Sequence, residues 1–99
     1  MRGKTEAPKK RMWNVQVEFL DGTIIDAISD EDAVERWRRL AAWTDTTVET
    51  DPEAWMDRVL ARARVVYGAQ FPSGLNGSAP APMILNALDD AECLIVRRK

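Results

Sequence analysis

The sequence contains no histidine and a single cysteine, Cys93, among its 99 residues. Without histidine the chain lacks the commonest general base and metal ligand, which excludes Ser-His and Cys-His catalytic pairs. One cysteine forms neither an internal disulfide nor a zinc or iron–sulfur centre. We therefore expect no cofactor, no metal and no enzymatic activity. Cys93 itself is expected to be a small buried hydrophobe with a raised pKa rather than a nucleophile.

Long hydrophobic runs are also missing. No stretch approaches the roughly 18 apolar residues of a membrane span, and no basic segment leads into an apolar one, as in a signal peptide. Together with the single cysteine, this predicts a cytoplasmic protein with no membrane partner. The chain is 45% hydrophobic and 30% charged, which is the composition of a folded protein, and its length suits one domain.

Charge is distributed unevenly along the chain. The net charge is −2, yet residues 1–11 hold five basic residues and one acidic residue. This segment has no hydrophobic period, so we predict a flexible basic tail over 1–11 and a single globular domain over 12–99. The basic ends either lie loosely on the acidic domain or bind nucleic acid. The nucleic-acid candidates are Lys9, Lys10, Arg11, Arg97, Arg98 and Lys99.

Other clusters give only weak chemical signals. The acidic run 30–32 is suited to a hard cation, but helix capping explains it without a ligand. The glycines of segment 68–82 lack the lysine of a phosphate-binding loop. Carboxylate pairs leave a small carboxylate-based enzyme as a second alternative function.

Residues 13–28 carry the clearest structural signal, a β-hairpin. Apolar and polar residues alternate from Trp13 to Phe19, as in a strand with one buried face. Asp21-Gly22 is a strong turn signal, because glycine adopts a positive φ without steric cost. A two-residue turn and a three-residue loop with a glycine bulge both fit. We favour the loop, because it keeps Asp26 off the buried face.

Two amphipathic helices are predicted next. Ser29 or Asp30 caps the first, and Asp51-Pro52 starts the second, which extends to Tyr67 and stops at Gly68. Both carry an apolar stripe that is expected to pack against the hairpin. The first stripe is Val34, Trp37, Leu40 and Ala41; the second is Trp55, Met56, Val59, Leu60, Ala63, Val66 and Tyr67.

The remaining residues predict a loop, a short helix and a strand. Segment 68–82 holds three glycines, three prolines and two serines, and loops of this length are commonly functional or mobile. A short helix over 83–91 is expected to bury Met83, Ile84, Ala87 and Leu88. A strand over 92–98 follows, and its apolar residues favour a central or well-covered position.

The predicted fold class is α+β, with the order ββααα(short)β. The hairpin and the C-terminal strand form a small, mostly antiparallel sheet, with the last strand beside the first. Two main helices and one short helix pack on one face of this sheet.

The tryptophans identify candidate contact residues. Trp37 and Trp55 fall on apolar stripes, whereas Trp43 lies at the margin of the first helix, near Arg36 and Arg39. Trp43 either stacks on the stem of Arg39 or anchors an interface, because Trp and Arg are frequent in binding hot spots. Phe71 and Leu75 either hold the 68–82 loop on the domain or contact a partner. The protein-contact candidates are Arg36, Arg39, Trp43, Phe71 and Leu75.

Together these features predict a small non-enzymatic protein that binds another protein. Arginine is strongly favoured over lysine within the domain and Ala, Asp and Trp are frequent, which is typical of GC-rich bacterial or phage genes. This composition fits an accessory protein of a phage or mobile element that acts on a host protein. A homodimer stays open, and nucleic-acid association through the basic ends is the first alternative.

Overall fold

The computed structural model describes residues 13–44 and 50–99. Within them, the elements are β1 (Val15–Phe19), β2 (Ile24–Ala27), α1 (Asp30–Thr44), α2 (Pro52–Val66), α3 (Ala81–Asp90) and β3 (Leu94–Arg98). The predicted α+β class and order of elements are confirmed. The basic tail predicted over 1–11 lies outside the described residues.

The sheet is antiparallel in the order β2-β1-β3, so the last strand lies beside the first, as predicted. A three-residue loop, residues 20–22, joins Phe19 to Thr23, which are paired with each other. The Gly22 N–H donates to the Phe19 carbonyl at 3.0 Å, and the Phe19 N–H donates to the Thr23 carbonyl at 2.8 Å. Gly22 has a φ of 93°, a conformation that favours glycine.

This loop fixes the register of the hairpin. Val17 lies opposite Ile25, and both are buried on the helix-facing side of the sheet. Asp26 pairs with Gln16 on the other side, where its carboxylate accepts a 2.9 Å hydrogen bond from the Gln16 amide. The register favoured from the sequence is therefore confirmed.

β3 lies at an edge of the sheet rather than at its centre. Helix α3 packs against it, and the Asp89 carboxylate accepts a hydrogen bond from the Val96 N–H at 3.3 Å. The apolar residues of β3 predict a central or well-covered strand, and the packing of α3 makes it a covered one. The same contacts protect an edge that could otherwise pair with another chain. Ile95, on the opposite face, remains 46% exposed.

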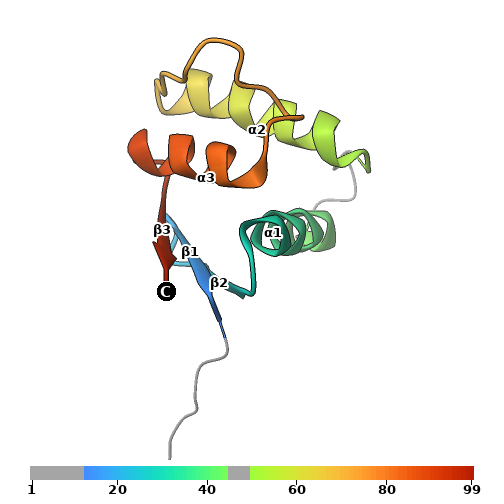
Figure 1. The fold of residues 1–99 in the computed structure, drawn as a ribbon. Helices are drawn as coiled ribbons and strands as arrows, with labels where there is room; N and C mark the ends of the chain where they lie inside the picture. The colour runs from blue at the N-terminus through green and yellow to red at the C-terminus, as the bar shows by residue number, and fades with distance from the viewer. Residues whose placement is uncertain (1–12, 45–49) are drawn as a thin grey trace, which may run out of the picture.

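The helices form two layers on one side of the sheet (Figure 1). α1 and α3 contact the strands, and α2 lies on the side of these helices that faces away from the sheet. The stripe of α2 therefore packs on the other helices. The prediction that it packs directly against the hairpin is wrong. The main buried side chains are Val15, Val17, Ile25, Trp55, Met56, Leu60, Leu75, Ile84, Leu85, Leu88 and Leu94.

The predicted helix caps are present. The Ser29 hydroxyl accepts a hydrogen bond from the Asp32 N–H at 3.0 Å, and the Asp51 carboxylate accepts one from the Glu53 N–H at 3.2 Å. Each cap satisfies a backbone donor that the first turn of a helix leaves unpaired. At the other end of α2, Gly68 takes a φ of 66° and ends the helix.

Four residues predicted to face the core are exposed instead: Leu40, Val66, Tyr67 and Met83. Leu40 and Tyr67 face a gap that remains between α1 and α2. Val66 belongs to the last turn of α2, whose outer side faces solvent. α3 begins two residues earlier than predicted and buries Leu85 in place of Met83, because it is packed between the sheet and α2.

The loop after α2 runs back along that helix (Figure 1). The Gly77 N–H donates to the Asp57 carboxylate at 2.6 Å, and Arg64 donates to the Leu75 carbonyl at 3.4 Å. A Cβ atom on residue 77 would overlap the Glu53 carbonyl oxygen, so this close approach requires glycine. The loop is thus held on α2 by backbone contacts.

Candidate functional site

A cleft of about 630 Å³ lies between α1, α2 and the hairpin turn. It exists because α1 and α3 hold α2 away from the sheet (Figure 1). Its volume lies within the range of about 300–1,000 Å³ that is usual for binding pockets. The lining residues are mainly apolar: Phe19, Leu20, Asp21, Thr23, Trp37, Leu40, Ala41, Trp55, Val59, Arg62, Ala63, Tyr67, Leu88, Cys93 and Leu94.

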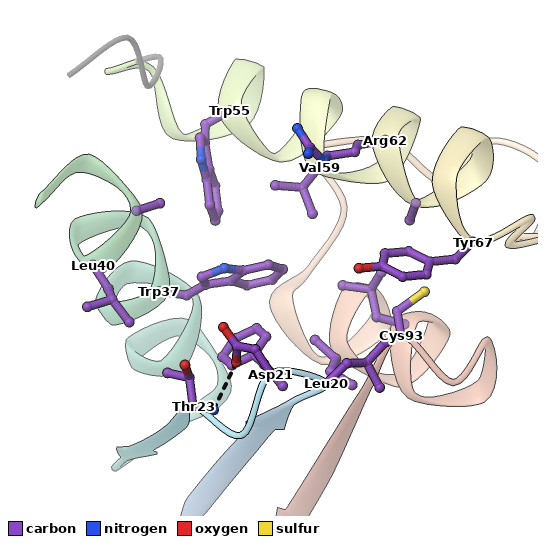
Figure 2. Close-up of a pocket in the computed structure, with 15 residues that line it drawn as sticks. Leu20, Asp21, Thr23, Trp37, Leu40, Trp55, Val59, Arg62, Tyr67 and Cys93 are labelled. Carbon is purple, nitrogen blue, oxygen red and sulfur yellow. Dashed lines mark hydrogen bonds between the residues drawn. The ribbon is translucent and has the colours of Figure 1, made fainter. Parts of the chain in front are cut away.

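Three aromatic rings in contact form one wall of the cleft. The centroids of Phe19 and Trp37 are 5.0 Å apart, and those of Trp37 and Trp55 are 5.1 Å apart with an edge-on angle of 84°. Such tilted contacts contribute about 0.5–1.5 kcal/mol each beyond the burial of their area. Trp55 is buried, whereas Trp37 is half-buried and projects into the cleft (Figure 2). The wall is therefore held by contacts between its rings and partly open to a ligand.

The mouth of the cleft carries exposed apolar side chains. Leu20 in the hairpin turn is 62% exposed, Leu40 on α1 is 42% exposed, and Tyr67 after α2 is 56% exposed. These side chains reach the cleft from three different segments (Figure 2). Apolar groups gathered in this way around a concave surface are typical of an interaction site.

Two charged side chains line the cleft. Asp21 belongs to the hairpin turn, where its carboxylate accepts a 2.9 Å hydrogen bond from the Thr23 N–H; this bond lowers the Asp21 pKa. Arg62 extends from α2 beside Val59 (Figure 2). The cleft thus has an anion on its hairpin side and a cation on its α2 side.

Cys93 also lines the cleft, just before β3, and is half-buried. Burial raises the pKa of its thiol. The thiol therefore stays protonated near neutral pH, as the sequence predicted, and acts here as part of an apolar lining.

The contact residues proposed from the sequence are divided between two regions. On α1, Arg36 bonds Asp32 at 2.8 Å and Arg39 bonds Glu35 at 2.9 Å, and both arginines are exposed. The backbone of Trp43 belongs to the last turn of α1, and its side chain lies outside the described part. The structure does not bring these α1 residues together with the loop after α2.

In that loop, Leu75 is buried in the core and Phe71 is half-buried, with the Arg64 guanidinium 5.1 Å from its ring centre. Both therefore hold the loop on the domain, which is the first of the two roles left open by the sequence.

The C-terminal nucleic-acid candidates each have a partner within the chain. Arg97 bonds Glu18 at 2.9 Å, and Arg98 bonds Asp30 at 2.6 Å. The Lys99 ammonium lies 5.0 Å from the ring centre of Trp13. These cations are distributed around the sheet as pairs rather than gathered into a groove. The N-terminal candidates Lys9, Lys10 and Arg11 lie outside the described residues.

The cleft itself was missed from the sequence. The helical spacing predicts that Trp37, Trp55 and Tyr67 belong to the core. Trp55 is buried and Trp37 is half-buried against the core, whereas Tyr67 is 56% exposed. A helical period identifies the face of a helix that is apolar, but it does not reveal whether a neighbour covers the whole face. The one available signal is the difference in length between the two apolar stripes. The α2 stripe continues to Tyr67, and it is longer than the stripe of α1 that faces it.

Within residues 13–44 and 50–99, no group of three or more His, Cys, Asp or Glu side chains is placed to hold a metal ion. None of the helices described combines the length and hydrophobicity that a membrane crossing requires. Comparisons with protein-family models, with curated proteins and with solved structures found no match.

Proposed function

We propose that this protein is a non-enzymatic binding module, and that the cleft between α1 and α2 receives apolar side chains of another protein. The observation that carries this proposal is the open aromatic cleft surrounded by exposed apolar residues, Leu20, Leu40 and Tyr67. A protein partner would remove both the cleft and these surrounding side chains from water, which supplies the main favourable term in association.

A protein partner fits this surface better than a small molecule. A small ligand inside the cleft would leave the outer faces of Leu40 and Tyr67 in water, whereas a protein surface would cover them. Aromatic side chains in a partly desolvated pocket are also the usual centre of a protein interface.

The contact region predicted on α1 is adjacent to this cleft in the chain. Leu40 lines the cleft, and Arg39 precedes it on the same helix. The composition typical of GC-rich bacterial or phage genes supports a cytoplasmic accessory protein that acts on a host protein. The nucleic-acid alternative has less support, because Arg97, Arg98 and Lys99 already have partners within the chain.

The test is affinity capture from a GC-rich bacterial lysate with two matched variants. Leu40→Glu places a carboxylate at the mouth of the cleft and should abolish capture of the specific partner. Val65→Glu introduces the same charge at a position that is 85% exposed and outside the cleft lining, and it should leave capture unchanged. Equal capture by Leu40→Glu and the parent protein would refute the proposal. Circular dichroism of both variants checks that each is folded.

A further inference from the structure

Arg62 differs from the other cationic residues of the described chain. Each of these others has an ion pair, a hydrogen bond or a ring contact within the chain, such as Arg38 with Glu35 and Arg64 with Phe71. For Arg62, among residues 13–44 and 50–99, no such partner is found. It is also the cation that lines the cleft.

The position of Arg62 has a consequence for any partner that docks there. It extends from α2 beside Val59, and Tyr67 directly follows the same helix (Figure 2). A partner that covers Tyr67 would partly remove the exposed Arg62 guanidinium from water. Burying a cation is costly unless an anion meets it, so the complementary partner carries a carboxylate at this point.

The backbone of the partner is also constrained. An extended peptide binds by pairing with the free edge of a sheet. On β3, the Val96 N–H is already bonded to the Asp89 carboxylate, and after β2 the Ile28 N–H is bonded to the Asp32 carboxylate at 3.1 Å. The cleft is lined mainly by helices and the hairpin turn, and its strand residues are Phe19 on the central strand β1 and Leu94 at the start of β3. A helix fits this surface, because it satisfies its own backbone hydrogen bonds.

Building on the proposed function, we propose that the occupant of the cleft is an amphipathic helix of a partner protein. Apolar side chains at spacing i, i+3 or i+4, and i+7 enter between Trp37 and Tyr67. An Asp or Glu on the flank of this stripe pairs with Arg62. The charge selects the orientation of the helix, and the apolar side chains supply most of the affinity.

The test is selection from a display library of helical peptides of about 15 residues, the length at which isolated helices become marginally stable. The bait is the full-length protein. Selected peptides should share an apolar stripe with a flanking Asp or Glu. Arg62→Glu should weaken the best peptide by about tenfold, as expected when one exposed attraction becomes a repulsion. Exchanging the acid of the peptide for Lys should restore its affinity for Arg62→Glu.

Arg58→Glu is the matched control. Arg58 lies four residues earlier on the same helix and does not line the cleft, so this variant should change affinity by less than about twofold. The difference between the two variants should shrink as salt is raised, because exposed charges are screened.

The outcomes separate this inference from the function on which it rests. Selected peptides without an acid, or a peptide affinity that Arg62→Glu leaves unchanged, would overturn the helix-and-carboxylate proposal. If Leu40→Glu still abolished peptide binding in that case, the cleft would remain a protein-binding site. Failure to enrich any helical peptide would also overturn it. If the purified chain proves to be a dimer that Leu40→Glu dissociates, the occupant is a second copy and the inference is wrong.

Discussion

Arg98, the last residue of β3, donates two hydrogen bonds to the carboxylate of Asp30 at the start of α1. The Nη2–Oδ2 distance is 2.6 Å and the Nε–Oδ1 distance is 3.2 Å. Asp30 is buried, and its carboxylate raises the pKa of Arg98. This pair ties the end of β3 to the beginning of a helix 68 residues earlier.

We predict that Arg98→Ala lowers the free energy of unfolding by about 1–2 kcal/mol. The substitution leaves a buried carboxylate without its cation, although the partial exposure of Arg98 reduces the loss. Urea denaturation measures the change. Arg97→Ala is the control, because its pair with Glu18 is more exposed and should contribute less than about 1 kcal/mol. Equal effects of the two substitutions would contradict the assigned role of Asp30.

Glu92 adopts a φ of 63° just after α3, a left-handed conformation that glycine usually occupies at a helix end. The Glu92 N–H donates to the Asp89 carbonyl, and the Cys93 N–H donates to the Leu88 carbonyl. Because a residue with a Cβ atom is strained in this conformation, we predict that Glu92→Gly stabilises the protein by about 1 kcal/mol. The Tm should rise by roughly 4–8 °C. Ala91→Gly, at a negative φ in the same turn, should instead lower it.

Gly77 lies directly on the first turns of α2. A Cβ atom there would overlap the Glu53 carbonyl oxygen, and the Gly77 N–H already donates to Asp57. We predict that Gly77→Ala costs about 1–3 kcal/mol, because the loop must move away from α2. Thermal unfolding measures the loss. Ser73→Ala, at an exposed position of the same loop, should stay within about 0.5 kcal/mol of the parent. A neutral Gly77→Ala would show that the loop does not rest on α2 in solution.

Acid sensitivity should come in part from two carboxylates of α1. The pKa of Asp32 is lowered mainly by the hydrogen bond from Arg36 and to a smaller extent by the one from the Ile28 N–H. Hydrogen bonds from Arg38 and Arg39 lower the pKa of Glu35. A lowered pKa in the folded state stabilises it above the ordinary values of 3.8 and 4.5, and this stability is lost as pH falls through the folded values.

The double variant Asp32→Asn, Glu35→Gln should therefore lose less stability than the parent between about pH 5 and pH 2. Urea midpoints measured across this range give the comparison. Asp90→Asn, which removes an exposed carboxylate from α3, serves as the control and should retain the slope of the parent. A double variant with the same slope as the parent would show that other groups determine the acid limit.

The local elements were predictable because their causes are local. The Asp21-Gly22 loop, the Ser29 cap and the stop at Gly68 each depend on the φ angle or hydrogen bonding of one or two residues. The hairpin register followed from keeping one carboxylate, that of Asp26, off the buried face. Each of these choices is decided by residues that are neighbours in the chain.

The cleft was not predictable for the opposite reason. Its position depends on how far α1 and α3 hold α2 from the sheet. The hydrophobic period of one helix does not specify this distance. Tyr67 continues the α2 stripe as a core residue would, yet it faces the open gap. Arg62 had no distinguishing sequence signal; its lack of a partner appears only when the other arginines have been paired in three dimensions.

Trp43 follows Leu40 by three positions on α1, and residues three apart are neighbours on a helix surface. Because Leu40 lines the mouth of the cleft, we predict that Trp43 contributes to partner binding rather than to the core. Trp43→Ala should change the free energy of unfolding by less than about 1 kcal/mol and weaken binding by about 2 kcal/mol or more. Trp55→Ala, at a position that is only 5% exposed, is the matched control and should cost about 3–5 kcal/mol of stability. Thermal unfolding of both variants, beside retention of the captured partner, makes the comparison. If Trp43→Ala unfolded as readily as Trp55→Ala, Trp43 would belong to the core, and the contact surface would have to be sought around Tyr67 and Arg62 alone.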